Sequence, residues 1–404
     1  MLWSISWRNI WRNKKRSAII VSAIAFGLWA GLLFMAFSIG WGEQMLQSAF
    51  DTRISHVHIF KKGFYESKEI GKSIPSGLGI LSEIRQMPEV KAAVGRVRVT
   101  AMATSPVTGA GVVVQGIVAE DESLVTKIHE MLTEGTYFET NKRNPVIIGE
   151  KLAEKLEVKL GSKIVLTAQR LDGDITAGAF RVVGIYKTVS SSFDGMTVLV
   201  NRGDIDRILG LGGQIHEIAV VARDYETISD LTESISNEHP ELNVVMWSDL
   251  APDLGYLEGA MAQMLYIFVV VILLALVFGI VNTMLMSVLE RIRELGVLMA
   301  VGMKHGRIFL MVVLETIMLA IVGGAVGLVV GVASVAFLGR VGLDLSYASE
   351  ALATWGASAV IYPHLPLAEY PKLLLLVIVV AVLSAIYPAI KAVKVNPVKA
   401  IRTY

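Results

Sequence analysis

The chain has 404 residues, 53% of them hydrophobic, and a formal net charge of +1 at pH 7. This composition is too apolar for an ordinary soluble protein and indicates membrane-embedded segments. The near-zero charge gives no reason to expect a nucleic-acid partner. The sequence contains no cysteine, which excludes disulfides, thiol nucleophiles and thiolate metal sites.

Segment 1–16 predicts an amphipathic helix at the membrane surface. Its tryptophans share one helical face at headgroup level, and its cations lie about a third of a turn away, toward anionic lipid. The first face comprises Trp3, Trp7, Ile10 and Trp11, and the second comprises Arg8, Arg12, Lys15 and Arg16.

Residues 17–42 carry no charge and are long enough to span a bilayer. A signal peptide has the same order of basic and apolar segments, but its apolar core is shorter, roughly 7–15 residues. We therefore expect an uncleaved first span. Helical spacing continues in Met45, Leu46, Ala49 and Phe50, which predicts that the helix extends beyond the membrane as a stalk.

Residues 43–258 are rich in charge, glycine and short β-type runs, and strands interleaved with short helices predict an α+β domain. Strands are expected at 56–60, 111–118, 163–168, 179–185, 197–200, 217–221 and 243–246. Helices are expected at 78–87, 149–156, 205–209 and 225–237.

Three further spans are predicted at 259–289, 308–338 and 373–390, where charged residues are nearly absent. Lysine and arginine gather at 1–16, 290–307 and 391–404. The loop between the third and fourth spans (339–372) carries three acidic residues within 339–371 against one arginine. This distribution predicts that both termini are cytoplasmic and that the domain at 43–258 lies outside.

The connector at 290–307 has the pattern of an amphipathic helix. Val288, Ile292, Leu295 and Met299 recur every three or four residues, while Glu290, Arg291, Arg293 and Glu294 occupy the other faces. Gly302 and Gly306 are expected to break the helix. Such a helix suits docking into a groove of a cytoplasmic partner; an ordinary polar loop is the alternative that the pattern alone leaves open.

In the third span, Gly323, Gly327 and Gly331 repeat every four residues, which predicts close helix packing, either within one subunit or across a dimer. Glu315 in the same span is a functional candidate, because ionisable groups inside a membrane are costly. We favour a packing role for it, protonated or hydrogen-bonded. His56 and His58 share a face of a predicted strand, but no third ligand is near in sequence, so a metal is not expected.

The run ERIRELGVLMAVGM at 290–303 and the ending YPAIKAVKVNPVKAIR at 387–402 resemble the FtsX-like permease family of ABC transporters, which includes the MacB efflux pump and the lipoprotein-release permeases LolC and LolE. The segment VIIGEKLAEKLEVKLGSKIVL at 146–166 is similar to the MacB-like periplasmic core. The resemblance implies a two-part core domain, with an outer lobe at about 120–214 inserted into a membrane-proximal lobe.

The resemblance also implies a role in which this chain is not an enzyme and binds no cofactor. A separate ABC ATPase dimer would bind ATP and Mg²⁺ and grip the connector at Glu290–Gly296, and a second permease subunit would complete the complex in a bacterial inner membrane. Because no ATPase domain is visible in the sequence, lipoprotein release toward the outer membrane is the expected function. Efflux of peptides or drugs with an adaptor, and regulation of a cell-wall hydrolase, are the alternatives.

Overall fold

The structure, a computed structural model, describes residues 7, 12, 14–138, 142–354 and 356–394. It consists of two compact units. The membrane unit comprises residues 1–42, 258–344 and 360–404, and the core domain comprises 43–257 and 345–359. Most of the predicted interfacial helix and of the basic tail at 391–404 lies outside the described residues.

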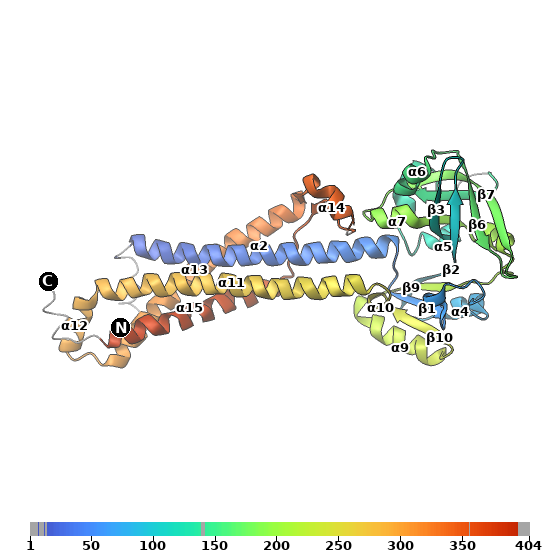
Figure 1. The fold of residues 1–404 in the computed structure, drawn as a ribbon. Coiled ribbons are helices and arrows are strands. Elements are labelled where there is room, and N and C mark those ends of the chain that lie inside the picture. Colours follow the sequence, from blue (N-terminus) through green and yellow to red (C-terminus); the bar gives the residue numbers. More distant parts are fainter. Residues whose placement is uncertain (1–6, 8–11, 13, 139–141, 355, 395–404) are drawn as a thin grey trace. The chain divides into compact units, whose positions relative to one another are not determined.

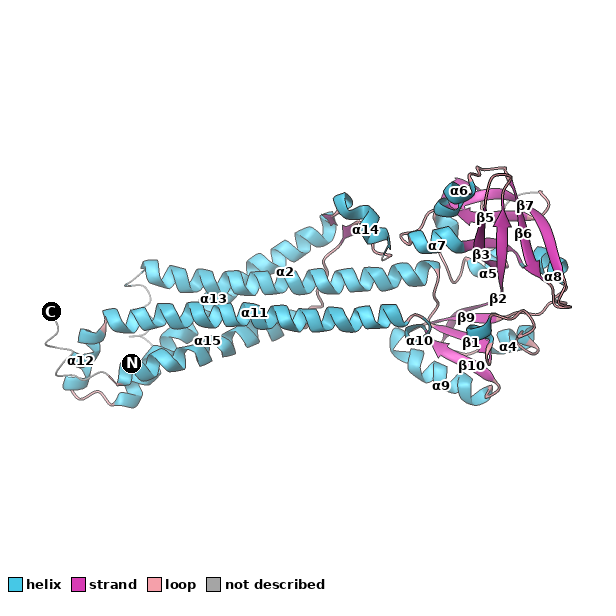
Figure 2. Ribbon diagram, viewed as in Figure 1, coloured by secondary structure: helices cyan, strands magenta, loops and turns pink. Residues whose placement is uncertain are grey.

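Four helices in the described residues are long and apolar enough to cross a membrane: α2 (Lys14–Thr52), α11 (Pro252–Glu290), α13 (His305–Val341) and α15 (Glu369–Val393). The four predicted spans lie inside these helices, and the prediction of a four-helix membrane protein with a large domain between the first two helices is confirmed. As expected from Met45 and Phe50, α2 continues to Thr52 without a break (Figures 1 and 2).

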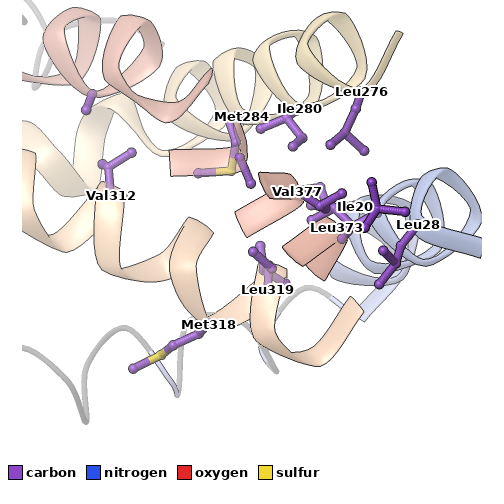
Figure 3. Close-up of a cluster of buried hydrophobic side chains, with 14 of the residues drawn as sticks. Ile20, Leu28, Leu276, Ile280, Met284, Val312, Met318, Leu319, Leu373 and Val377 are labelled. Carbon is purple, nitrogen blue, oxygen red and sulfur yellow. The ribbon is translucent and has the colours of Figure 1, made fainter. Parts of the chain in front are cut away.

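The interior of the membrane unit is one apolar cluster to which α2, α11, α13 and α15 all contribute. Figure 3 shows part of this cluster, where Ile20 and Leu28 of α2 lie close to Leu373 and Val377 of α15. Buried positions on α2 recur every four residues, in Ile20, Ile24, Leu28, Leu32 and Ala36. A single buried stripe on each helix leaves the remaining apolar faces for lipid or for partner helices.

The glycine stripe of α13 packs against α2 of the same chain. A Cβ added at Gly323 would lie 2.9 Å from the carbonyl oxygen of Val21, and one at Gly327 would lie 2.6 Å from that of Ala25. At Gly331 the nearest atom would be a side-chain carbon of Leu32, at 2.5 Å. These glycines therefore allow two backbones to approach closely, which is the intrasubunit alternative left open by the sequence.

The core domain contains a ten-stranded sheet with the strand order β10-β1-β9-β2-β3-β8-β5-β7-β4, while β6 pairs with β2 and β7. The strands are β1 (Val57–Lys61), β2 (Val90–Thr104), β3 (Gly109–Ile117), β4 (Leu132–Gly135), β5 (Pro145–Gly149), β6 (Lys163–Gln169), β7 (Ile175–Tyr186), β8 (Thr197–Asn201), β9 (Glu217–Ala222) and β10 (Leu242–Met246). The longer helices are α4 (Gly77–Ile84), α6 (Glu150–Leu156), α7 (Ser191–Met196), α8 (Arg202–Leu209) and α9 (Ile228–Glu238).

Strand β2 belongs to both lobes of this domain. Its first half pairs with β9 and contributes to a hydrophobic cluster with β1, α4 and α9, whereas its second half pairs with β3 and β6. The hydrophobic core of the second lobe runs from Val97 to Leu211. The predicted outer lobe began at about 120, so it omitted β2 and β3.

Most of the expected strands are found within a few residues of their predicted positions, but β2, β4 and β5 were not predicted. Strand β2 contains four alanines and Gly95, which are poor strand formers. They hide the alternation of large apolar and polar residues by which a strand is recognised in a sequence. A Cβ at Gly95 would lie 2.8 Å from the terminal carbon of Ile215, so the glycine leaves room for this side chain.

Candidate functional site

The connector is a short helix that a single residue separates from α11. Helix α11 ends at Glu290, α12 spans Ile292–Ala300, and Arg291 between them has φ −105° and ψ 17°. Gly302 has φ +97° and lies in the turn before α13, as predicted. Gly306, by contrast, lies inside α13, so the expectation that it breaks a helix was wrong.

The two faces of α12 have different environments. Leu295 and Gly296 are buried against the membrane unit, and Val288 beside them is only 4% exposed. Glu290, Arg293 and Glu294 face solvent. The apolar stripe thus anchors the connector, and its charged residues remain accessible.

Two exposed apolar side chains extend the accessible face and were not predicted. Val297 is 47% exposed and Val301, just after α12, is 83% exposed. These two valines give the exposed face of the connector an apolar part beside its charged residues. Val297 lies three and four residues after Glu294 and Arg293, and Val301 follows four residues later, so helical spacing is the signal in the sequence that could have identified them.

Glu315 of α13 lies at the centre of an ion-pair network. Its side chain is buried, and Arg16 of α2 donates a hydrogen bond to its Oε1 over 2.8 Å. Arg291, in the connector, donates to its Oε2 over 3.2 Å. Glu315 thus accepts hydrogen bonds from two guanidinium groups that belong to different segments of the membrane unit.

The network continues to the surface through Glu294. Arg291 donates to Glu294 over 3.1 Å, and Arg12 donates to both carboxylate oxygens of Glu294. The hydrogen bond from Arg12 is the main reason why the pKa of Glu294 lies below its usual value. Arg16 also lies 3.9 Å from the carboxylate of Glu290.

We call the six residues Arg12, Arg16, Glu290, Arg291, Glu294 and Glu315 the connector network. Arg12 and Arg16 come from the N-terminal side, Arg291 and Glu294 from the connector, and Glu315 from the third membrane helix. A displacement of the connector must stretch or exchange these ion pairs. The network therefore links three segments that are distant in sequence.

The core domain holds a second buried ion cluster. Arg96 of β2 is 2% exposed and donates to both carboxylate oxygens of Glu122, at 3.0 and 2.6 Å. It also lies 3.5 Å from Glu217 of β9, which accepts a hydrogen bond from Arg98 over 3.2 Å. The cluster joins the β9 side of β2 to the segment that follows β3, so it spans both lobes.

His58 of β1 completes this cluster as a neutral ring. Its Nδ1 lies 2.5 Å from Glu217, and its Nε2 accepts a hydrogen bond from the backbone N–H of Ser55, which fixes the tautomer with the proton on Nδ1. Burial lowers the pKa of His58 more than Glu217 raises it. Burial alone would raise the pKa of Glu217, but Arg98, His58 and Arg96 together bring it well below its usual range.

The histidine pair singled out in the sequence does not form one site. The Nδ1 of His56 accepts a hydrogen bond from the N–H of Ala222, while His58 bonds Glu217 and Ser55. Among the described residues, no group of three histidine, aspartate or glutamate side chains is arranged to hold a metal ion.

Comparisons with known proteins agree with this layout. A family model described as the MacB-like periplasmic core domain matches residues 17–238, more than half of the chain, and one described as the FtsX-like permease C-terminal matches 266–397. An uncharacterized ABC transporter permease of Methanocaldococcus jannaschii is 27% identical over 280 residues, which are 67% of this chain and 65% of the relative. A pyoverdine export ATP-binding/permease protein of Pseudomonas syringae is 24% identical over 98% of this chain and 58% of its own length.

A macrolide export ATP-binding/permease protein of Nitrosomonas europaea is 24% identical over 81% of this chain and 50% of its own. The chain thus spans only about half to two thirds of the length of these relatives. Among solved structures, the extracellular domain of the ABC-type transporter YknZ matches 47% of this chain and all of its own, at 18% identity and a TM-score of 0.34. The match to the periplasmic region of MacB from Actinobacillus actinomycetemcomitans covers 52% of this chain and 97% of that structure, at 12% identity and a TM-score of 0.36.

With one model matching the first membrane helix and the core domain, and the other matching the connector and the last three membrane helices, the chain belongs to the FtsX-like and MacB-like permease family of ABC transporters.

Proposed function

We propose that this chain transmits the movement of an ABC ATPase, through its connector, to the core domain on the other side of the membrane. The observation that supports this most directly is the connector network, in which buried Glu315 binds both Arg16 and Arg291. These ion pairs couple the connector to the first and third membrane helices. A push on the connector then moves the whole bundle instead of bending one loop.

In this proposal the ATPase binds the solvent-exposed face of the connector, which comprises α12 and the end of α11 at Glu290. Glu290, Arg293 and Glu294 supply charge, and Val297 supplies apolar contact. Leu295 and Gly296, which the resemblance placed among the contact residues, act from the opposite face by holding α12 against the bundle. ATP and Mg²⁺ bind the ATPase, and this chain performs no chemistry of its own.

The placement in the membrane follows from the distribution of lysine and arginine. Both termini and the connector lie in the cytoplasm, and the core domain lies outside the inner membrane. A second permease subunit, which the family resemblance implies, completes the proposed complex. Because the chain has no cysteine, single cysteines at exposed Ser236 and Lys304 test this directly. A membrane-impermeant thiol reagent should label S236C but not K304C in intact spheroplasts; the reverse pattern contradicts the orientation.

The cargo belongs to one of two classes. The expected class is a lipoprotein released from the outer leaflet, and the alternative is a small molecule or peptide exported from the outer compartment. The relatives named for pyoverdine and macrolide export favour the alternative. Mass spectrometry of the natively purified complex separates the two, because a lipoprotein carrier or an export adaptor would be recovered with it.

The coupling proposal is tested by Arg293→Glu. This side chain is exposed, so its reversal leaves the membrane unit folded but places a like charge against an anionic contact on the ATPase. We expect at least a tenfold loss of copurified ATPase with unchanged insertion. Lys391→Glu is the matched control, since it reverses an exposed cation near the same end of the bundle, outside the connector. Undiminished recovery of ATPase with Arg293→Glu would refute the assignment.

A further inference from the structure

A cleft of about 640 Å³ opens in the core domain between its two lobes. Leu78 of α4 lines it from the lobe that contains β1 and β9, and Ile117 of β3 and Gly203 of α8 line it from the other lobe. This volume lies within the range of about 300–1,000 Å³ that is usual for small-molecule sites. Because residues of both lobes line the cleft, a change in the angle between the lobes changes its width.

The apolar wall of the cleft is partly aromatic. Tyr137 and Phe138 both line it, with ring centroids 5.3 Å apart in a T-shaped arrangement. Phe138 has φ +60°, a left-handed conformation that is uncommon for an aromatic residue. Such strained residues concentrate at ligand-binding positions. Leu78, 41% exposed, faces the same space.

The polar wall carries both signs of charge. Arg202 is half-buried and, within the described part of the chain, forms no salt bridge; its one hydrogen bond is a long contact of 3.4 Å with the carbonyl of Gly95. Glu120 and Asp206 line the cleft as well, and the carboxylate of Asp206 accepts a hydrogen bond from the N–H of Gly213. A wall with one unpaired cation and two acids complements a ligand that carries both an anion and a cation.

We infer that this cleft binds a small zwitterionic amphiphile, namely a short peptide with a large apolar side chain. Its carboxylate pairs with Arg202, its ammonium group faces Glu120 and Asp206, and its apolar side chain packs against Tyr137, Phe138 and Leu78. Peptide binding does not depend on the coupling mechanism; only the further step, that such a peptide is transported, rests on the proposed function.

Gly203 provides a way to fill the cleft without disturbing the fold. A Cβ added there has no atom within 4 Å, and its φ is not in the left-handed region, so Gly203→Trp projects into open space. Gly111 of β3 is the matched control, because a Cβ there also meets nothing within 4 Å and the residue does not line the cleft. Both variants add the same side chain to an open position.

The test uses the full chain in lipid nanodiscs and the tripeptide Phe–benzoylphenylalanine–Leu with free termini as a photo-crosslinking probe. We expect saturable labelling of the protein at residues that line the cleft, around 117–120, 137–138 or 202–206, when the labelled chain is digested and sequenced by mass spectrometry. Gly203→Trp should reduce labelling at least tenfold, and Gly111→Trp should leave it unchanged. Arg202→Gln should weaken binding about tenfold for the free-carboxylate peptide and not for its C-terminal amide.

Two results would overturn the inference. One is labelling that does not saturate or that is equally strong in Gly203→Trp and the wild type, which would mean non-specific partition. The other is equal binding of the free and amidated peptides to the wild type, which would remove the role of Arg202. Since no ATPase is present, neither result depends on whether the connector couples to one.

Discussion

Arg16 and Glu315, 299 positions apart, meet inside the membrane unit, where the guanidinium donates to the carboxylate over 2.8 Å. Arg291 approaches the other carboxylate oxygen at 3.2 Å. One acidic side chain thus holds the start of the first membrane helix and the connector together. Removing it leaves Arg16 with Glu290 at 3.9 Å and Arg291 with Glu294 at 3.1 Å, and both of these carboxylates lie on the exposed side of the network.

The first prediction is that Glu315→Ala strongly destabilises the membrane unit. Breaking a buried ion pair by deleting one partner costs about 3–5 kcal/mol, because the remaining charge stays buried. Glu315→Gln should cost less, since its amide oxygen still accepts a hydrogen bond. Thermal unfolding in detergent, followed by helical circular dichroism, measures the difference.

Glu294→Ala is the control for this experiment. Its pairs with Arg12 and Arg291 are exposed, and exposed pairs contribute about 0–1 kcal/mol. If Glu294→Ala is as destabilising as Glu315→Ala, the buried pair is not the main connection of the network. If Glu315→Gln folds normally and still couples ATP hydrolysis at the wild-type rate, the charge of Glu315 is not part of the transmission path.

The sequence predicted the membrane spans and the apolar stripe of the connector, because hydropathy and helical periodicity are local properties. Glu315 was recognised as unusual, since a lone acid in an apolar run is visible without a structure. Its partner Arg16 was not predictable, because it belonged to a basic cluster already explained by lipid headgroups. Leu295 stood both on the predicted apolar stripe and in the matching motif, and it is buried in the bundle together with Gly296.

The lobe boundary failed for a different reason. Strand β2 crosses from one lobe to the other, and a local pattern cannot show that one strand serves two hydrophobic cores. The clusters around Arg96 and the cleft beside Arg202 depend on pairings between distant strands. Arg96, Glu122 and Glu217 each appear in the sequence as ordinary surface charges.

A second prediction concerns the glycine stripe. Gly327→Ala should lower the unfolding temperature by several degrees, because the new Cβ lies 2.6 Å from the carbonyl oxygen of Ala25 and the two helices must separate. Gly279→Ala in α11 is the control, since a Cβ there meets nothing within 4 Å and alanine is favoured over glycine in a helix by about 1 kcal/mol. Loss of dimer content in Gly327→Ala without loss of subunit stability would instead make the stripe a dimer contact.

A third prediction concerns Arg96. Arg96→Met removes the only guanidinium that contacts both Glu122 and Glu217 among the described residues, and leaves two carboxylates in the interior. We expect a loss of about 3–5 kcal/mol from the core domain. Arg98→Met should cost less, since Arg98 is partly exposed and pairs with Glu217 alone. The β-sheet band in the infrared reports this unfolding selectively, because the membrane unit is almost entirely helical.

The last prediction is a pH dependence that comes from His58. Burial lowers the pKa of this residue, so between its unfolded-state pKa of about 6.5 and its lower folded-state pKa the unfolded chain binds a proton that the folded chain does not. Stability of the core domain should therefore fall as pH decreases from about 6.5, by at most about 1.4 kcal/mol per pH unit from this group. His58→Gln should flatten that dependence, because glutamine can still donate to Glu217 and accept from Ser55 but does not titrate.

The comparison between wild type and His58→Gln isolates this effect from the other groups that titrate nearby. Burial also lowers the pKa of His56 and of His216, and burial raises the pKa of Asp194 to about 6, which acts with the opposite sign. These groups are present in both proteins and cancel in the difference. The pKa of Glu217 lies below its usual range, so this residue stabilises the folded domain above about pH 4.3. Its contribution to stability is lost only at lower pH, where the unfolded chain takes up a proton near the ordinary pKa of about 4.3.

Infrared melting curves at pH 7.5, 6.5 and 5.5 should therefore diverge between the two proteins only below about pH 6.5. Curves that stay parallel over this range would mean that His58 has the same affinity for protons in the folded and unfolded chain, and that the buried bond to Glu217 compensates fully for the loss of water.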